Sequence, residues 1–221
     1  MADKFYVYRP MLDLLGFTEG TDKGRGYNET LAYGKFTGGD RNLVGMTMSQ
    51  IDALQTQMLA HPKNTFDSSA LGRYQIVRTT RREIQEQLNI PDSAKFDKDM
   101  QDRMACYLLG YRGIDKWLEG DMSTDMLVNN LAKEWASLPT TKNVSHYGGQ
   151  HAAVNALHVV DVLAEVRKRW VSTDHPIEQP APPKPDFGVG SSPEPAFGDP
   201  RPRKMPTMFQ RISKLLRAWF R

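Results

Sequence analysis

A proline-rich stretch near the C-terminus limits what this chain can fold into. Ten of its 14 prolines lie between Pro176 and Pro206, with Gly and Ser among them. Proline fixes φ and removes a backbone donor, so such a stretch forms neither a helix interior nor a central strand. We therefore predict a flexible linker over residues 174–206, one folded domain over residues 1–173 before it, and a short separate segment over residues 207–221 after it.

The segment after the linker combines basic and apolar residues at helical spacing. Residues 201–221 contain seven Lys or Arg and no Asp or Glu, so the net charge of +3 divides into +7 there and −4 over residues 1–200. This pattern predicts a basic amphipathic helix over residues 207–221 that binds anionic membrane lipid or lipopolysaccharide. Docking of this helix onto the domain or a partner is the alternative. A nucleic acid is not expected, because phosphate binding needs no wide apolar stripe.

Composition excludes several classes of protein. With 39% hydrophobic residues the chain can bury a core, and its single cysteine, Cys106, rules out an internal disulfide. The five histidines lack metal-ligand spacing, so neither a metal nor a cofactor is expected. The N-terminus resembles no cleavable signal peptide, and no apolar run reaches membrane-spanning length. We expect a monomer made in the cytoplasm that reaches any target outside the inner membrane after membrane permeabilisation.

Hydrophobic spacing predicts a mainly helical body with one small β element. Helical patterns cover about residues 9–18, 47–61, 70–90, 97–113, 123–136 and 151–170. Residues 26–44, rich in Tyr, Phe, Thr and Gly, are typical of a short antiparallel hairpin. Together these elements predict an α+β fold. In the last helix, the spacing assigns the buried side to Val154, Leu157, Val160, Leu163, Val166 and Trp170.

A single carboxylate ends the first predicted helix. Leu12, Leu15 and Gly16 share a helical face with Glu19, and a Gly-Thr pair stops the helix directly after it. A carboxylate at this position lies near the negative end of the helix dipole and near apolar neighbours, and both raise its pKa. Glu19 is therefore a candidate general acid, although a solvated surface Glu would have the same spacing.

Three polar segments at the ends of predicted helices occur in a fixed order. They are LDLLGFTEGTDKGRGYN at residues 12–28, SSALGRYQI at 68–76, and WASLP at 135–139 with Tyr-Gly at 147–148. Together they resemble the bacteriophage lambda lysozyme family of peptidoglycan lytic transglycosylases over roughly residues 8–170. The helix near residues 49–59 and the C-terminal extension depart from that family's pattern.

The resemblance implies a lysozyme-like fold, mainly helical with a small antiparallel β element lining a cleft. It implies cleavage of the β-1,4 bond between N-acetylmuramic acid and N-acetylglucosamine in peptidoglycan glycan strands, without a cofactor. Glu19 matches the family's catalytic acid. Arg73 is equally consistent with a substrate contact and with a structural ion pair. The substrate-binding residues that the resemblance implies are Gln75, Tyr74, Asp22, Tyr27, Ser137 and Tyr147.

The lack of a well-spaced second carboxylate favours transglycosylation. Glycoside hydrolysis normally uses two carboxylates, but the position nine residues after Glu19 is Asn28, and Glu29 and Asp40 are less well placed. A transglycosylase instead uses the C6 hydroxyl of muramic acid as an internal nucleophile and leaves a 1,6-anhydro product. Two alternatives stay open: a muramidase that uses Glu19 with Asp40, and a non-catalytic protein that binds the envelope or disrupts membranes through residues 207–221.

Overall fold

The computed structural model describes residues 3–148 and 151–173. The predicted linker over 174–206 and the predicted helix over 207–221 lie outside the described residues. Within them, seven α-helices and three short 3-10 helices occur. The α-helices are α1 (Arg9–Thr18), α2 (Met48–Ala60), α3 (Arg78–Gln87), α4 (Lys98–Tyr111), α5 (Ile114–Glu119), α6 (Thr124–Glu134) and α7 (Ala156–Ser172), and the 3-10 helices are η1 (Thr21–Lys23), η2 (Gly26–Asn28) and η3 (Leu43–Gly45).

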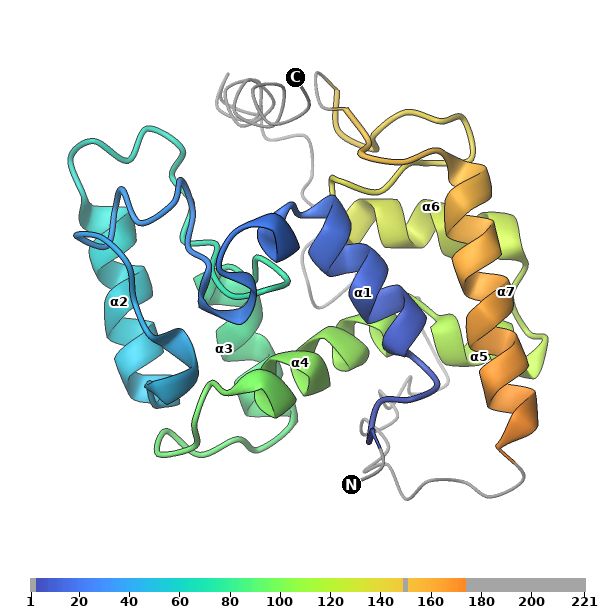
Figure 1. Cartoon of the computed structure of the whole chain (residues 1–221), viewed down its shortest axis with the longest axis horizontal. Helices are drawn as coiled ribbons and strands as arrows, with labels where there is room; N and C mark the ends of the chain where they lie inside the picture. The colour runs from blue at the N-terminus through green and yellow to red at the C-terminus, as the bar shows by residue number, and fades with distance from the viewer. Residues whose placement is uncertain (1–2, 149–150, 174–221) are drawn as a thin grey trace, which may run out of the picture.

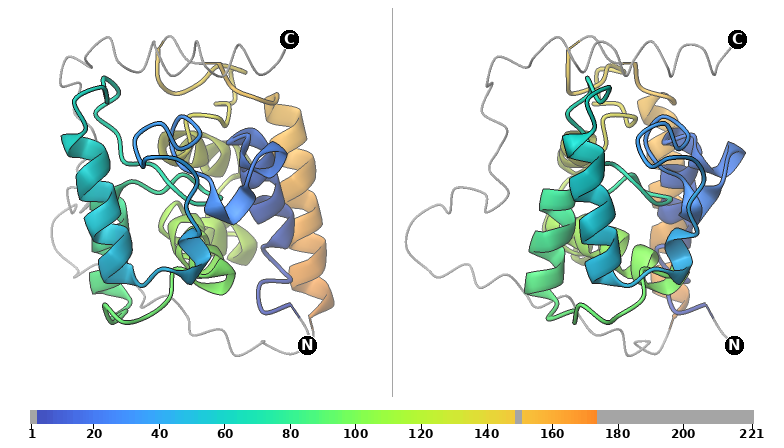
Figure 2. Two further views of the ribbon diagram at one scale, coloured as in Figure 1. Left: turned by 60° about the vertical axis from the view of Figure 1, so that its left-hand side comes forward. Right: turned by 90° about the vertical axis from the view of Figure 1, so that its left-hand side faces the viewer.

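Helix α4 joins two groups of helices (Figures 1 and 2). On one side α2 and α3 pack together, and on the other α1 packs along α7 next to α5 and α6. One hydrophobic core runs through both groups, with Leu15 of α1, Leu54 of α2 and Leu108 of α4 all buried. The loop after α1 lies against α4, since the Tyr27 hydroxyl of that loop donates to Asp102 at 2.7 Å. None of the helices in the described ranges is long and apolar enough to cross a membrane.

Side-chain caps start four of the helices. At α2, α4 and α6 they lie where the sequence predicts the helix to begin, whereas α7 begins at Ala156 and not at the predicted residue 151. Thr47 and Gln50 form a reciprocal capping box at α2. Asp97, Ser123 and Asn155 each accept a hydrogen bond from the backbone N–H three residues on, at α4, α6 and α7. At α1 the predicted bounds are confirmed, and Gly20 with φ 73° ends that helix because it adopts the left-handed conformation at no steric cost.

The predicted hairpin over residues 26–44 is wrong. Residues 31–38 form successive turns in which Ala32, Tyr33 and Gly34 all have positive φ, so the chain reverses before it can extend into a strand. The described residues contain isolated β-bridges only, including those that pair Leu71 with Thr30 and with Ile76. The fold is therefore mainly helical and fits a lysozyme-like helical arrangement without the expected β element.

Two predicted helices also differ in extent. The helix expected over 70–90 begins only at Arg78, because Gly72 and Gln75, with φ of 77° and 50°, form a tight turn instead. The helix expected over 97–113 ends at Tyr111, and the left-handed Gly113 separates it from α5, which the sequence did not indicate. These glycine-marked breaks interrupt an otherwise helical hydrophobic pattern.

The buried face of α7 is only partly the predicted one. Leu163 and Val166 are buried as expected, but Leu157 and Trp170 are 67% and 42% exposed, and Val159 is buried in their place. The helix begins at the Asn155 cap and packs along α1. That contact follows the stripe 159–163–166, and Leu157 lies nearly on the opposite side of the helix. Trp170 continues the stripe but lies in the last turn of α7.

Candidate active site

Glu19 is the last residue of the α1 turn, and its carboxyl faces the loop that follows α6. Its backbone N–H donates to the Leu15 carbonyl at 2.9 Å, so the side chain is fixed at its base by the helix. Burial raises the pKa of the Glu19 carboxyl to about 7, and a hydrogen bond from Ser137 opposes that rise. The residue keeps partial exposure to solvent. A reachable carboxyl that is half protonated near neutral pH can act as a general acid and as a general base.

Ser137 is the nearest polar partner of Glu19. Its Oγ lies 2.6 Å from Glu19 Oε1 and 3.1 Å from Thr18 Oγ1, and the residue is only 5% exposed. The loop that carries it is folded on itself, because the Ser145 hydroxyl donates to the Ala136 carbonyl at 3.0 Å. The Ala153 N–H donates to the Ser137 carbonyl at 2.8 Å. The third sequence motif thus meets the first at the carboxyl of Glu19.

Arg73 ties the second motif to the first. Its Nε and Nη2 donate to the two carboxylate oxygens of Asp22 at 2.7 and 2.8 Å, and Nη2 also reaches Asp13 at 3.0 Å. The guanidinium lies over the rings of Tyr27 and Tyr74, at 5.3 and 5.7 Å from their centroids. Of the two roles open for Arg73, these contacts correspond to the structural ion pair. They hold the loop after Glu19 against the turn at residues 72–75.

A buried carboxylate on α4 completes this network. Asp102 accepts hydrogen bonds from the hydroxyls of Tyr74 and Tyr27 at 2.5 and 2.7 Å, and it pairs with Arg9 Nη2 at 2.8 Å. Burial raises the pKa of both tyrosines, so both hydroxyls stay protonated as donors. Tyr74 is only 1% exposed. Three of the residues expected to touch substrate, Asp22, Tyr27 and Tyr74, are therefore engaged in holding the loop.

The other two expected substrate contacts lie nearer the surface. Gln75 is half-buried, and its Nε2 donates to the Gly72 carbonyl at 2.9 Å within the tight turn. Thr21 binds this turn to α1, since its hydroxyl lies 2.7 Å from the Arg73 carbonyl. The Tyr147 hydroxyl donates to the Lys133 carbonyl at 2.7 Å, which holds the ring beside the end of α6.

The two rival carboxylates have other partners. Asp40 has 78% of its side chain exposed and pairs with Arg25. Glu29 is buried, and its Oε1 accepts from Arg25 Nη2 at 2.8 Å and from the Thr30 N–H at 2.9 Å. Glu29 therefore organises the loop that carries Arg25. Neither carboxylate shares a hydrogen-bond partner with Glu19 in the described residues.

Thr18, Thr21 and Asp102 belong to the site, although the sequence analysis did not select them. Thr18 and Thr21 flank Glu19 in the first motif, and this position could have indicated that they belong to the candidate site. Asp102 lies in the middle of α4, 3% exposed, among residues of ordinary helical spacing. Nothing local distinguishes it from a surface aspartate.

A substitution in α1 tests how tightly the Arg73–Asp22 pair is packed. A Cβ on Gly16 would lie 2.5 Å from Arg73 Nε and 2.6 Å from an Asp22 carboxylate oxygen. We expect Gly16→Ala to lower the free energy of unfolding by about 1–3 kcal/mol, because the pair must move. In an ordinary helix the same change would be stabilising by up to about 1 kcal/mol. Denaturant unfolding measures the sign, and a more stable variant would contradict the packing described.

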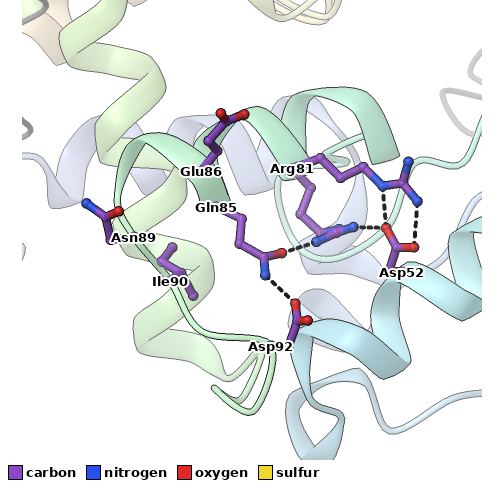
Figure 3. A pocket seen from close by; sticks show the side chains of 8 residues that line it. Asp52, Arg81, Gln85, Glu86, Asn89, Ile90 and Asp92 are labelled. Carbon is purple, nitrogen blue, oxygen red and sulfur yellow. Dashed lines mark hydrogen bonds and ion pairs between the residues drawn. The ribbon is translucent and has the colours of Figure 1, made fainter.

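A separate hollow lies between α2 and α3 (Figure 3). It has a volume of about 620 Å³ and is lined by charged and amide side chains. Asp52 pairs with both Arg81 and Arg82, Arg81 donates to Gln85, and Gln85 donates to Asp92 at 2.7 Å. These groups satisfy one another and cross-link the two helices. The hollow shares no lining residue with the surroundings of Glu19, and we assign it a structural role.

The sequence model of the Endolysin family matches residues 9–172, which is more than half of the chain. The chain belongs to the Endolysin family. No match is found among curated proteins or among solved structures. The endolysin match runs from the first residue of α1 to the last residue of α7 and includes all three motifs. Membership identifies a phage enzyme that degrades the peptidoglycan of the cell wall, which favours an enzyme over the non-catalytic alternative.

Proposed function

We propose that this endolysin is a lytic transglycosylase that cleaves the bond between N-acetylmuramic acid and N-acetylglucosamine and leaves a 1,6-anhydromuramic end. The observation that carries the proposal is the environment of Glu19, a lone carboxyl with a pKa of about 7. Such a group is present in both protonation states at neutral pH. One residue can therefore serve the acid step and the base step in turn.

The reaction needs a single carboxyl and no activated water. Protonated Glu19 gives its proton to the glycosidic oxygen as the bond from that oxygen to C1 of muramic acid breaks. The resulting carboxylate then takes the proton of the C6 hydroxyl of the same sugar, whose oxygen bonds to C1. Because nucleophile and electrophile belong to one sugar, their effective concentration is very large. Glu19 is protonated again at the end, so the cycle closes.

The ion pairs that Asp40 and Glu29 make elsewhere support this mechanism over two-carboxylate hydrolysis. Asp40 and Glu29 both pair with Arg25, which lies between η1 and η2. In the proposed site, Gln75 and Tyr147 contact the sugar strand. Asp22, Tyr27 and Tyr74 act instead by holding the loop, and peptidoglycan glycan strands are the substrate.

Mass analysis of the products tests the proposal. Purified peptidoglycan is digested with the full chain, and the soluble muropeptides are weighed. Anhydro ends would support a transglycosylase, and reducing ends would identify a muramidase. The absence of soluble products would favour the non-catalytic alternative. Asp40→Asn is the matched variant, and we expect it to keep most of the activity. A loss as large as that of Glu19→Gln would show that Asp40 is a second catalytic group.

We further propose that residues 207–221 dock the enzyme on anionic membrane lipid or lipopolysaccharide. The support is the sequence alone, in which four basic residues alternate with apolar ones. Each basic residue near an anionic surface contributes about 1 kcal/mol. We expect the full chain to sediment with anionic vesicles at least about tenfold better than a chain ending at His175, and high salt to reduce the difference. Equal sedimentation of the two chains would refute this role.

A further inference from the structure

We infer that Ser137 and Thr18 form a two-position hydroxyl switch that follows the protonation state of Glu19. Both are positioning residues, since Thr18 is fully buried and Ser137 nearly so. The inference deepens the proposed function and rests on Glu19 acting first as an acid and then as a base.

The hydroxyl proton of Ser137 has two acceptor oxygens within reach. Ser137 Oγ lies 2.6 Å from Glu19 Oε1 and 3.1 Å from Thr18 Oγ1. The Thr18 hydroxyl donates to the Leu15 carbonyl at 3.3 Å, so its single proton is in use and its oxygen accepts. Ser137 also has one proton. It can therefore donate to Glu19 or to Thr18, and a rotation about its Cβ–Oγ bond exchanges the two.

Each position matches one state of Glu19. When Glu19 is a carboxylate, the Ser137 proton forms a charge-assisted hydrogen bond with Oε1. When Glu19 is neutral, Ser137 can turn to Thr18 Oγ1. In both states the buried hydroxyls keep an acceptor, so no buried polar group is left unsatisfied. Glu19 can then change from acid to base without a backbone movement.

Ser137 is the side chain that binds the Glu19 carboxyl, and several charged groups on the elements around α1 have other partners. Lys23 of η1 lies over the Phe17 ring, 5.7 Å from its centroid. Several other charged groups there are ion-paired: Asp22 and Asp13 with Arg73, Asp102 with Arg9, Glu134 with Arg112, and Glu165 with Arg169.

Two substitutions in the full chain test the switch, and their expected effects have opposite signs. Ser137→Ala removes the donor to the carboxylate, so the pKa of Glu19 should rise by about one unit. Thr18→Val is nearly isosteric and removes the second acceptor, which disfavours the neutral state, so the pKa should fall by about half a unit. Carbon NMR of labelled glutamate carboxyls measures both values, and the pH–rate profile of peptidoglycan release should shift in the same directions.

A merely structural role gives a different result. A loosened fold would rehydrate Glu19 and lower its pKa in both variants. Shifts of the same sign, or no shift in either, would overturn the inference. Thr18→Ser keeps the hydroxyl and should restore the wild-type value, and Ser137→Cys, a weaker donor, should give an intermediate rise if Ser137→Ala does not fold. Reducing ends in the product analysis would refute the transglycosylase proposal and leave these pKa measurements to decide the switch.

Discussion

Replacement of Glu19 by Gln is expected to lower the rate of peptidoglycan release by about 10²–10⁴-fold. The amide has nearly the same shape, but it can neither give a proton to the glycosidic oxygen nor take one from the C6 hydroxyl. Release of soluble fragments from purified peptidoglycan measures the rate. The Asp40→Asn variant, the same change at an exposed carboxylate, serves as the control. Activity within a few-fold of wild type in Glu19→Gln would refute the role of Glu19.

The same variant should reveal the cost of ionising Glu19 in the folded state. Because burial raises its folded-state pKa from 4.5 to about 7, the folded chain binds this proton more tightly than the unfolded chain does. The resulting stability is fully present below pH 4.5 and is lost as pH rises through 7. We therefore expect Glu19→Gln to be more stable than wild type at pH 8, by roughly 1–3 kcal/mol, and similar at pH 4. Thermal unfolding at the two pH values tests this.

Substitution of Arg73 by Met should give a marked loss of stability. Its side chain is only 10% exposed, and it pairs with Asp22 and Asp13 and lies over two tyrosine rings, so its removal takes away the ion-pair partner of both aspartates. We expect the free energy of unfolding to fall by about 1–3 kcal/mol, because the hydrogen bonds of a nearly buried guanidinium to charged partners are lost. Denaturant unfolding measures the loss. Peptidoglycan release should also fall, because the loop after Glu19 loses its anchor.

Arg82 provides a matched control for that substitution. It too makes a two-nitrogen pair with an aspartate, at 2.6 and 2.7 Å from Asp52, but its side chain is 54% exposed. Exposed pairs contribute about 0–1 kcal/mol, so Arg82→Met should have a small effect on stability and none on activity. Equal losses in the two variants would contradict the role given to Arg73.

Local signals were sufficient for most of the helices. The bounds of α1, the Thr47 cap of α2 and the Asp97 cap of α4 follow from spacing and capping chemistry within a few residues. The spacing alone left Glu19 open between a general acid and a solvated surface residue, and the resemblance selected it as the candidate acid. Ser137 could be selected only by the resemblance, because 118 residues separate it from Glu19.

The parts of the fold that the sequence did not predict depend on contacts between residues far apart in the chain. The turn at residues 72–75 replaces helix because Gly72 and Gln75 adopt positive φ while Thr21 and Gln101 hold the Arg73 backbone. The expected hairpin fails for a similar reason, since its Tyr- and Gly-rich composition suits successive left-handed turns as well as strands. In α7, packing against α1 buries Val159 and leaves Leu157, on the other side of the helix, exposed. Tertiary packing overrides propensity in all three cases.

Asp102 couples the local unfolding of three segments of the chain. One carboxylate accepts from Arg9, Tyr27 and Tyr74, which belong to the start of α1, the loop after Glu19 and the tight turn. If one segment unfolds, Asp102 loses one of its three donors, and the carboxylate that the other two segments bind is held less firmly. Backbone amides in the three segments should therefore exchange with deuterium as one cooperative unit, slower than those of the surface turns at residues 31–38.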